Sequence, residues 1–283
     1  MVGSLVGLRA EAVLEAHNVR IRGSGAVTAL LAHGYGCDGG VWRHIVPALS
    51  ETYRTVTFDY VGCGASVVAY DPAKYQSLDG YADDVLEICR ALGQDPVIFV
   101  GHSVSAMIGA LAAEREPARF LALVMVAPSP RYLNDKDYAG GFTRQDIESL
   151  LGLLDADREG WAAAMAPTIM GNPDRPELAD ELEENFCRMD PAVARQFARV
   201  TFTADNRADL ARISVRTLVL QCSDDALAPL EVGSYVYRNL PDGRFVQLAA
   251  SGHCPHLSAP EEMVSAIQAF LAELAPPERA EDR

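Results

Sequence analysis

A serine in the segment GHSVS, residues 101–105, has the surroundings of a catalytic nucleophile. The short apolar run 97–100 precedes it and a helical pattern follows it, so Ser103 would lie at a sharp strand-to-helix turn. Such a turn holds the serine hydroxyl above the edge of a sheet, and the helix start points backbone N–H groups at a developing oxyanion. Gly101 is suitably small, whereas Ser105 stands where the usual G-x-S-x-G pattern has its second glycine. The context predicts acyl-transfer chemistry at Ser103.

Two later residues could complete a triad in the chain order Ser, acid, His. Asp225 and His253 each follow a predicted strand. Because the carboxyl ends of parallel strands meet at one edge of a sheet, both side chains would lie near Ser103. His253 would then remove the serine proton, and Asp225 would hold the imidazole in the tautomer that makes this possible. The neighbouring Asp224 is the competitor for the acid position.

An oxyanion hole requires a second backbone donor besides the one at the serine turn. The segment HGYG, residues 33–36, follows the first central strand and is placed to supply the Tyr35 N–H, paired with the N–H of Val104. A simple glycine turn is the alternative interpretation. It becomes the weaker one once Ser103 is accepted as a nucleophile.

The same loop also fits a dinucleotide-binding pattern. Gly34, Gly36 and Gly39 match the pattern G-x-G-x-x-G of sites that bind NAD. Asp59, at the end of the next predicted strand, would be the acidic residue of such a site. That interpretation leaves the triad unexplained, and it requires His33 and Tyr35 to crowd a pyrophosphate. We therefore expect no cofactor.

A metal site is also not expected. His253 and His256 flank Cys254, but no second cluster completes four ligands. The cysteines are dispersed without a C-x-x-C pair, which is typical of free thiols in a cytoplasmic protein. They are Cys37, Cys63, Cys89, Cys187, Cys222 and Cys254.

The predicted elements would place these residues on one sheet. Between residues 19 and 127, short apolar runs alternate with helical patterns, which indicates βαβ units and a mostly parallel central sheet flanked by helices. Ser77 is placed to cap an amphipathic helix that reaches Leu92. The predicted strands are 28–32, 55–59, 97–100, 121–126, 215–221 and 245–248, and a last helix covers 260–274.

A helical insertion is predicted between the two parts of this sheet. Strand patterns vanish over 131–204, where four helical stretches are expected with breaks at 134–141, 167–176 and 190–191. We therefore expect an α/β core formed by 1–130 and 205–275, with 131–204 as a lid. The proline-led, charged tail 276–283 has nothing to bury and is predicted to be disordered.

Composition excludes several classes of function. The chain has 283 residues, 49% of them hydrophobic and 22% charged, so it can bury a core. Its net charge of -15 disfavours nucleic acid and anionic membrane surfaces as partners. No apolar run approaches the roughly 18 residues of a membrane span, and residues 1–16 lack the pattern of a secretory signal. A soluble, cytoplasmic protein is expected.

Many segments occur together in the order known from one family: HGYGCD, FDYVGCG, YQSLDGYADDVLEI, VGHSVSAMIG, PSPRYLND, YAGGF, NPDRPE, QCSDDALAP and GHCPHLS. From about Asn18 to Leu274 the chain resembles the RsbQ-like α/β-hydrolases, bacterial energy-stress regulators related to the plant strigolactone and karrikin receptors. Ser105 is similar to the receptor form, whereas NPDRPE and FDYVG are similar to the RsbQ form.

The resemblance implies an α/β-hydrolase fold with a V-shaped four-helix lid, a triad of Ser103, Asp225 and His253, and slow hydrolysis. It also implies a partner, a sensor-domain phosphatase or other signalling protein that activates a stress sigma factor. Independently, apolar side chains on the insertion predict a lid lining, of which about a third would face a ligand. The candidate substrate-binding residues are His102, Tyr132, Phe142, Leu150, Leu154, Trp161, Met165, Phe186, Phe197, Phe202 and Leu227.

The sequence thus predicts a serine hydrolase for a small hydrophobic ester or lactone, with a regulatory role through a partner protein. Two alternatives stay open. One is a ligand-perceiving signalling protein with little or no turnover, and the other is a carbon–carbon bond hydrolase that uses the same triad.

Overall fold

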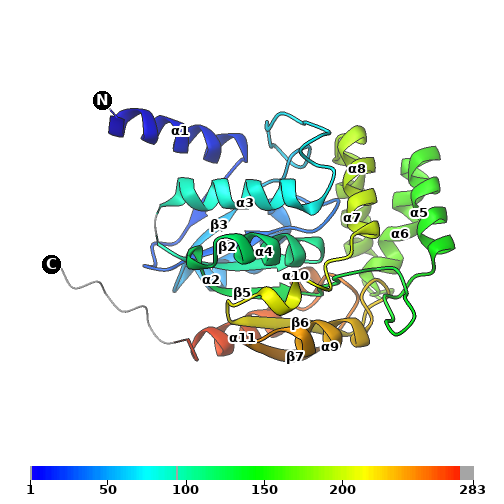
Figure 1. The fold of residues 1–283 in the computed structure, drawn as a ribbon. Helices are drawn as coiled ribbons and strands as arrows, with labels where there is room; N and C mark the ends of the chain where they lie inside the picture. The colour runs from blue at the N-terminus through cyan, green and yellow to red at the C-terminus, as the bar shows by residue number, and fades with distance from the viewer. Residues whose placement is uncertain (1, 94, 275–283) are drawn as a thin grey trace.

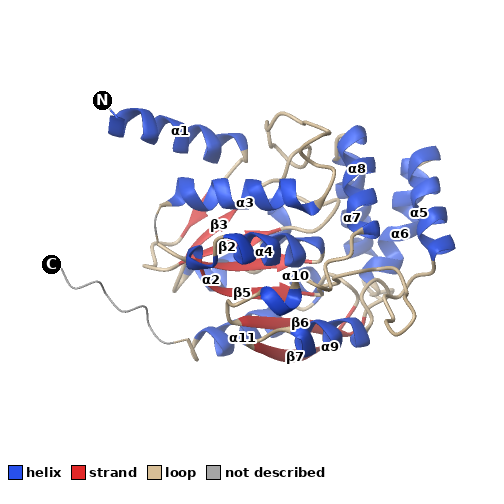
Figure 2. Cartoon of the chain, in the orientation of Figure 1, coloured by secondary structure: helices blue, strands red, loops and turns tan. Residues whose placement is uncertain are grey.

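The computed structural model describes residues 2–93 and 95–274, so the predicted disordered tail 276–283 lies outside the described residues. Its centre is a seven-stranded sheet in the order β1-β3-β2-β4-β5-β6-β7. Neighbouring strands are parallel except for β1, which is antiparallel to β3. Helices lie along both faces of the sheet, and four more stand beyond one end of it (Figures 1 and 2).

The elements follow one another as βαβ units, which is the α/β-hydrolase arrangement expected from the sequence. The strands are β1 Arg20–Arg22, β2 Thr28–Ala32, β3 Arg54–Thr57, β4 Val97–His102, β5 Phe120–Val126, β6 Thr217–Asp224 and β7 Gly243–Ser251. The α-helices outside the lid are α1 Val2–Ala16, α2 Val46–Ser50, α3 Leu78–Leu92, α4 Val104–Arg115, α9 Leu230–Asn239, α10 Pro255–Ser258 and α11 Pro260–Leu271. Short 3-10 helices are η1 Gly39–Trp42, η2 Pro117–Arg119 and η3 Leu210–Arg212.

Two hydrophobic cores form, one on each face of the sheet. Leu30 and Phe99 belong to the core under α3 and α4, whereas the next residues in the strands, Leu31 and Val100, belong to the core under α2 and α11. Adjacent strand residues point to opposite faces, so a strand buried on both faces is apolar throughout. This explains why β4 and β5 were predicted correctly from continuous apolar runs.

The N-terminal part contains two elements that were not predicted. Helix α1 contacts α3, and Val13 and Leu14 pack against the core there. Strand β1 is three residues long and exposed along its whole length. An exposed Arg-Ile-Arg strand has no hydrophobic alternation of the kind that identifies a half-buried strand, so only pairing with β3 reveals it.

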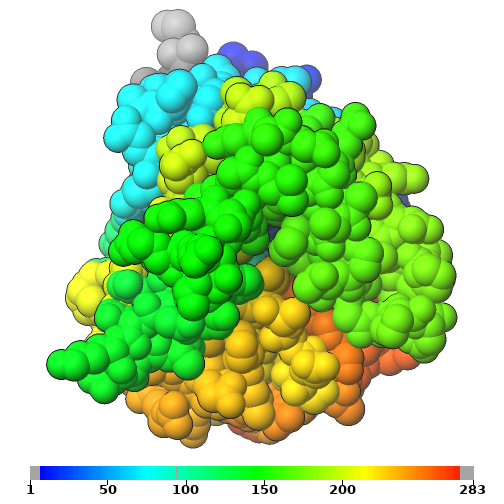
Figure 3. All heavy atoms as spheres, turned by 90° about the vertical axis from the view of Figure 1, so that its right-hand side faces the viewer, coloured from blue at the N-terminus to red at the C-terminus, as the bar shows by residue number. Residues whose placement is uncertain are grey.

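Four helices connect β5 to β6: α5 Arg144–Ala156, α6 Arg158–Met170, α7 Pro176–Arg188 and α8 Pro191–Thr203. We call α5–α8 the lid. In Figure 3 these segments, coloured green to yellow-green, cover the face of the molecule beyond the sheet. Among the described residues, no helix is both long enough and apolar enough to cross a bilayer.

The breaks between the lid helices differ in part from the expectation. Pro167 was predicted to end a helix but lies inside α6, which continues to Met170 and ends at Gly171 in the left-handed conformation. Proline removes one backbone donor, and here the helix stops one turn later. The break that the sequence pattern missed is Asp157, whose carboxylate caps α6 by accepting from the Gly160 N–H.

Candidate active site

Ser103 lies at the turn between β4 and α4, as its context predicts. Its backbone has φ 56° and ψ −122°, a strained conformation for a residue with a side chain. The turn needs Gly101, because a Cβ there would lie 2.5 Å from the Ser105 carbonyl oxygen. Close packing behind the turn therefore holds the serine hydroxyl at the carboxyl end of the sheet.

The structure brings the three predicted triad residues together. Ser103 Oγ lies 2.7 Å from His253 Nε2, and His253 Nδ1 lies 2.7 Å from Asp225 Oδ2. All three are buried, with 6%, 2% and 4% of their surfaces exposed. With Nδ1–H donating to the carboxylate, Nε2 is free to accept the serine proton. This arrangement is that of a nucleophile, a general base and an orienting acid.

Asp225 is held by its own loop as well as by His253. Its Oδ1 accepts from the backbone N–H groups of Leu227 and Ala228, at 2.9 and 3.0 Å. Burial alone would raise the pKa of Asp225, but the charge of His253, the bond to it and the two N–H donors together lower that pKa below its ordinary value. The carboxyl is thus ionised when it orients the imidazole. Asp224, the competitor, is exposed at the end of β6.

The predicted oxyanion donors lie on the two segments that flank the serine. Val104 is the first residue of α4, a position whose N–H has no acceptor within the helix. Tyr35 lies in the loop after β2, where Gly36 has φ 77° and a Cβ would come 2.0 Å from the Phe186 ring. Only glycine fits at that position, and the absence of a side chain there allows α7 to pack closely against the loop.

The Tyr35 side chain is enclosed by the lid. Its hydroxyl donates to the Ala194 carbonyl of α8 at 3.2 Å. Its ring meets Trp161, Phe186 and Phe197 at centroid distances of 5.9, 6.0 and 5.7 Å. The residue that supplies a predicted oxyanion donor is therefore packed against three of the four lid helices.

His253 is joined to the lid as well. Its backbone N–H donates to the Ile169 carbonyl at the end of α6, at 2.8 Å. Gly252 precedes it with φ 82°, and a Cβ there would lie 1.8 Å from the Met170 carbonyl oxygen. The histidine loop and the α6 terminus therefore pack with no room for a side chain between them.

Ser105, which replaces the usual glycine, has a bonding role of its own. It is fully buried, and its hydroxyl donates to the His33 carbonyl. The Tyr60 hydroxyl lies 3.1 Å away, and because a serine has a single proton, Tyr60 donates in that second bond. Ser105 thus ties the nucleophile turn to the start of the oxyanion loop.

A cavity of about 30 Å³ adjoins Ser103, enough for roughly one water molecule. Tyr132 lies on its wall, with its hydroxyl 3.3 Å from Ser103 Oγ, and burial raises the pKa of that hydroxyl. The cavity is closed by apolar side chains from α6, α7 and α8 and from the loops. Its lining is Tyr35, Cys37, His102, Ser103, Tyr132, Trp161, Ile169, Leu182, Phe186, Thr201, Phe202, Leu227, His253 and Cys254.

Several candidate substrate-binding residues lie in this lining, namely His102, Tyr132, Trp161, Phe186, Phe202 and Leu227. Others lie elsewhere: Phe142, Leu150, Leu154, Met165 and Phe197 pack within or against the cores. Phe197, for example, stacks on Tyr81 at 4.2 Å. Sequence reasoning missed Cys37, Ile169, Leu182, Thr201 and Cys254, although Cys37 and Cys254 directly follow predicted motifs.

The dinucleotide-like pattern has a structural explanation. Asp59 Oδ1 accepts from the Gly39 N–H at 2.7 Å, and Oδ2 accepts from Asn18 Nδ2 and the Ala65 N–H at 2.7 and 2.9 Å. Both carboxylate oxygens are therefore engaged in holding three chain segments together. The acidic residue has this structural role where an NAD site would use it to bind ribose.

A cluster of buried histidines surrounds the site. His256 contacts Trp42 and His102 at ring distances of 5.0 and 4.4 Å, and its two nitrogens find no partner among the described protein atoms. Burial and the neighbouring His253 lower the pKa of His102 to about 3, and burial lowers the pKa values of His33 and His256 too. In the part of the chain that the structure describes, no three His, Cys, Asp or Glu side chains form a metal-binding group.

These histidines predict a loss of stability in mild acid. Below a pKa of about 6.5 the unfolded chain binds protons that the native state does not bind, so the free energy of unfolding falls as the pH falls. Well below pH 6.5, an imidazole that stays neutral in the native state contributes a limiting slope of about 1.4 kcal/mol per pH unit, so the slope should steepen as the pH falls. Urea unfolding between pH 7 and pH 5 measures this slope.

Two variants check the source of that slope. His256→Phe keeps an aromatic ring beside Trp42 and should reduce the slope, because it removes one group that binds a proton in the unfolded chain more readily than in the native state. His44→Gln, at an exposed position, should leave it unchanged. Stability that stays constant from pH 7 to pH 5 would show that these imidazoles are not neutral in the native state.

The fold and the site define an α/β hydrolase. Residues 29–266 match the model of the alpha/beta hydrolase family, and the chain belongs to that family. Its relatives include karrikin insensitive 2 receptor CA of Petunia hybrida, 38% identical over 257 residues that cover 90% of this chain and 95% of that protein. Strigolactone esterase D14 of Arabidopsis thaliana is 38% identical, covering 92% and 97%. A solved hydrolase structure from Oleispira antarctica is 40% identical, with a TM-score of 0.91 and coverage of 94% and 98%.

Proposed function

We propose that this protein is a cytoplasmic serine hydrolase that cleaves a small, mostly apolar ester or lactone. The observation that carries the proposal is the pair of 2.7 Å hydrogen bonds that joins Ser103 to His253 and His253 to Asp225. The Ser103 backbone has a positive φ, which is a strained conformation. A hydrogen-bonded serine, histidine and aspartate activate the serine hydroxyl for attack on an acyl carbon.

The reaction follows from the geometry in two stages. Ser103 Oγ attacks the acyl carbon while its proton passes to His253 Nε2, and the N–H groups of Val104 and Tyr35 stabilise the oxyanion. His253 then gives the proton to the departing alkoxide, leaving an acyl-enzyme. Water, activated by the same imidazole, attacks that ester and releases the acid. In a lactone, the alkoxide and the acid belong to one molecule.

The substrate class follows from the lining of the cavity. Trp161, Phe186 and Phe202 present apolar surface, while Tyr132 offers a hydroxyl beside the nucleophile. A space of about 30 Å³ is too small for any ester of drug or hormone size, which needs roughly 300 Å³ or more. Substrate must therefore displace lid helices, and we expect turnover to be slow.

Labelling and turnover test the hydrolase proposal directly. A fluorophosphonate should modify Ser103, as read by mass spectrometry of the digested protein, and p-nitrophenyl acetate should be hydrolysed with a burst of acyl-enzyme. Denatured protein is the control for non-specific labelling. Absence of both modification and turnover in the folded protein would refute the assignment.

The finer proposal is a regulatory role of the RsbQ type, in which a signalling protein such as a sensor-domain phosphatase responds to the hydrolase. Supporting it, relatives with 38% identity are named as receptors, and the lid contacts both Tyr35 and the His253 loop. A change at the serine would thereby reach the outer surface. The closed cavity also favours a second candidate, a ligand-perceiving protein in which binding matters more than turnover.

Hydrogen exchange separates the lid response from the rest of the fold. When a phosphonate occupies Ser103, we expect altered exchange in α5–α8 and unchanged protection in β4 and β5. Complementation of a deletion strain then decides between the two candidates. Failure of Ser103→Ala indicates that hydrolysis is required, whereas full rescue supports perception by binding.

A further inference from the structure

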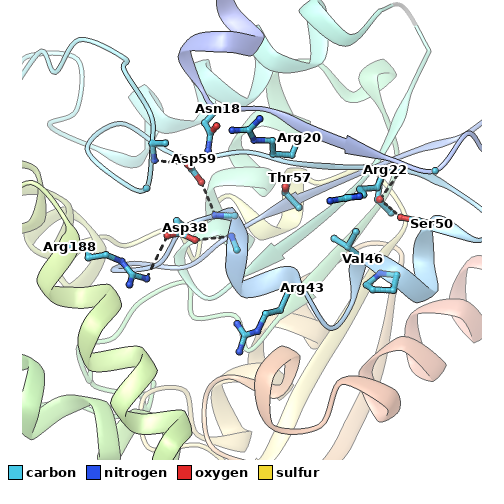
Figure 4. Close-up of a pocket in the computed structure, with 17 residues that line it drawn as sticks. Asn18, Arg20, Arg22, Asp38, Arg43, Val46, Ser50, Thr57, Asp59 and Arg188 are labelled. Carbon is cyan, nitrogen blue, oxygen red and sulfur yellow. Dashed lines mark hydrogen bonds and ion pairs between the residues drawn. The ribbon is translucent and has the colours of Figure 1, made fainter.

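A second cavity, of about 830 Å³, lies at the β1 edge of the sheet, and none of its lining residues lines the Ser103 cavity (Figure 4). Its walls come from β1 and β3 on one side and from η1 and α2 on the other. This volume falls in the range of about 300 to 1,000 Å³ that is typical of small-molecule sites. The hydrolytic reaction makes no use of it.

The pairing of β1 with β3 determines which side chains face this cavity. Arg20 lies opposite Thr57, and Arg22 lies opposite Thr55. Because alternate residues of paired strands share one face, two guanidinium groups and two hydroxyl groups point to the same side. Figure 4 shows Arg20 and Arg22 projecting from one strand with Thr57 between them. The threonines are buried, so they form the floor beneath exposed arginines.

The two arginines lack the partners that their neighbours have. Arg43 forms a two-pronged pair with Glu181 at 2.6 and 2.5 Å, and Arg188 lies 3.9 Å from Asp38. Among the residues that the structure describes, Arg20 and Arg22 form no ion pair, in a chain with 39 acidic and 24 basic residues. Like charges two residues apart on one strand face repel each other. An anion between them would remove that repulsion.

The acidic residues of the cavity are already engaged. Both Asp59 oxygens accept from the loops and from Asn18, and Asp38 Oδ1 accepts from the Gly40 N–H at 2.8 Å. They lie at the end toward Arg188 in Figure 4, away from Arg22. Arg22 therefore adds its guanidinium charge at the end of the cavity opposite these two carboxylates. Val46 and Pro47 add apolar surface on the α2 side.

We propose that this cavity binds a small organic anion. The carboxylate or phosphate group of the anion lies between the Arg20 and Arg22 guanidinium groups above the Thr57 hydroxyl. The apolar part of the anion contacts Val46 and Pro47. Planar guanidinium donors match the oxygens of either group in two-pronged hydrogen bonds. The two cavities share no lining residue, so we expect anion binding here to be independent of the serine chemistry.

Calorimetric titration with phenyl phosphate and, separately, benzoate tests the site and identifies the preferred anionic group. At least one probe should bind, and its affinity should fall as ionic strength rises. Arg20→Gln with Arg22→Gln should weaken binding about tenfold or more, since each charge-assisted bond is lost. The matched control is Arg144→Gln with Arg238→Gln, which removes the same charge from exposed positions on α5 and α9 and should leave affinity unchanged.

Two further measurements place the probe in the cavity. Thr57→Val removes a hydroxyl without changing charge and should weaken binding about threefold or more. Protein phosphonylated at Ser103 should bind the probe as the unmodified protein does. Binding that is absent for both probes, survives the double Arg20 and Arg22 change, or disappears on phosphonylation overturns the proposal. If binding survives the double arginine change, the arginines instead protect the edge strand from pairing with another chain. Unchanged p-nitrophenyl acetate turnover in the variants confirms that the fold and the serine site are intact.

Discussion

Replacing Ser103 by alanine is expected to lower p-nitrophenyl acetate turnover by about 10⁴-fold or more. The loss is large because the serine, the imidazole and the carboxylate act as one unit, so the remaining two cannot form an acyl-enzyme. Steady-state kinetics of the purified variant measure the effect. Fluorophosphonate labelling should vanish together with turnover, since both depend on the same oxygen.

The structure also provides a control for this substitution. Ser234→Ala makes the same chemical change on α9, away from the Ser103 cavity, and should retain full activity and labelling. Removing a buried hydroxyl at Ser103 leaves His253 bound to Asp225, so the variant should fold. Near-normal turnover by Ser103→Ala would place the nucleophile elsewhere.

The second large effect separates two adjacent acids. Asp225→Asn should reduce turnover by about 10⁴-fold, because an amide NH₂ facing His253 Nδ1 favours the wrong imidazole tautomer. Nε2 would then carry the proton and could not accept one from Ser103. The substitution preserves the local fold, since an asparagine oxygen can still accept from the Leu227 and Ala228 N–H groups that hold Asp225.

Asp224→Asn is the matched control. Its carboxylate is exposed, and the backbone carbonyl that accepts from Gly252 is unaffected by the change. We expect activity within a few-fold of the parent protein. Thermal unfolding of both variants distinguishes a catalytic loss from a folding defect. If Asp224→Asn were the inactive variant, the acid would have been assigned to the wrong neighbour.

Sequence patterns predicted the elements that carry the triad because each is marked by strong local chemistry. The strand before Ser103 begins with four apolar residues, the strand before Asp225 contains the apolar segment 218–220, and the turns that follow contain small or polar residues. Chain order and the geometry of parallel strands then brought the three residues to one edge. The N-terminal elements lacked such marks. Strand β1 exists through its pairing with β3, which no local pattern reveals.

The lid lining was harder to predict because helical periodicity identifies a buried face without saying what buries it. Phe197 and Phe202 lie on the same helix, yet Phe197 packs onto Tyr81 while Phe202 reaches the cavity. The cavity beside Arg20 was not anticipated for a related reason. Its walls come from segments that only tertiary pairing brings together.

The contacts that join Tyr35 and His253 to the lid couple lid movement to the order of steps in catalysis. Helices that move to admit a substrate also release the Tyr35 ring from its enclosure and strain the bond from the His253 N–H to Ile169. With the lid open, Tyr35 and His253 are therefore not held in position for catalysis. They are held in position only when the lid is closed. Each catalytic event would then begin with closure of the lid and end with its reopening, so the lifetime of the closed form would limit the rate of turnover.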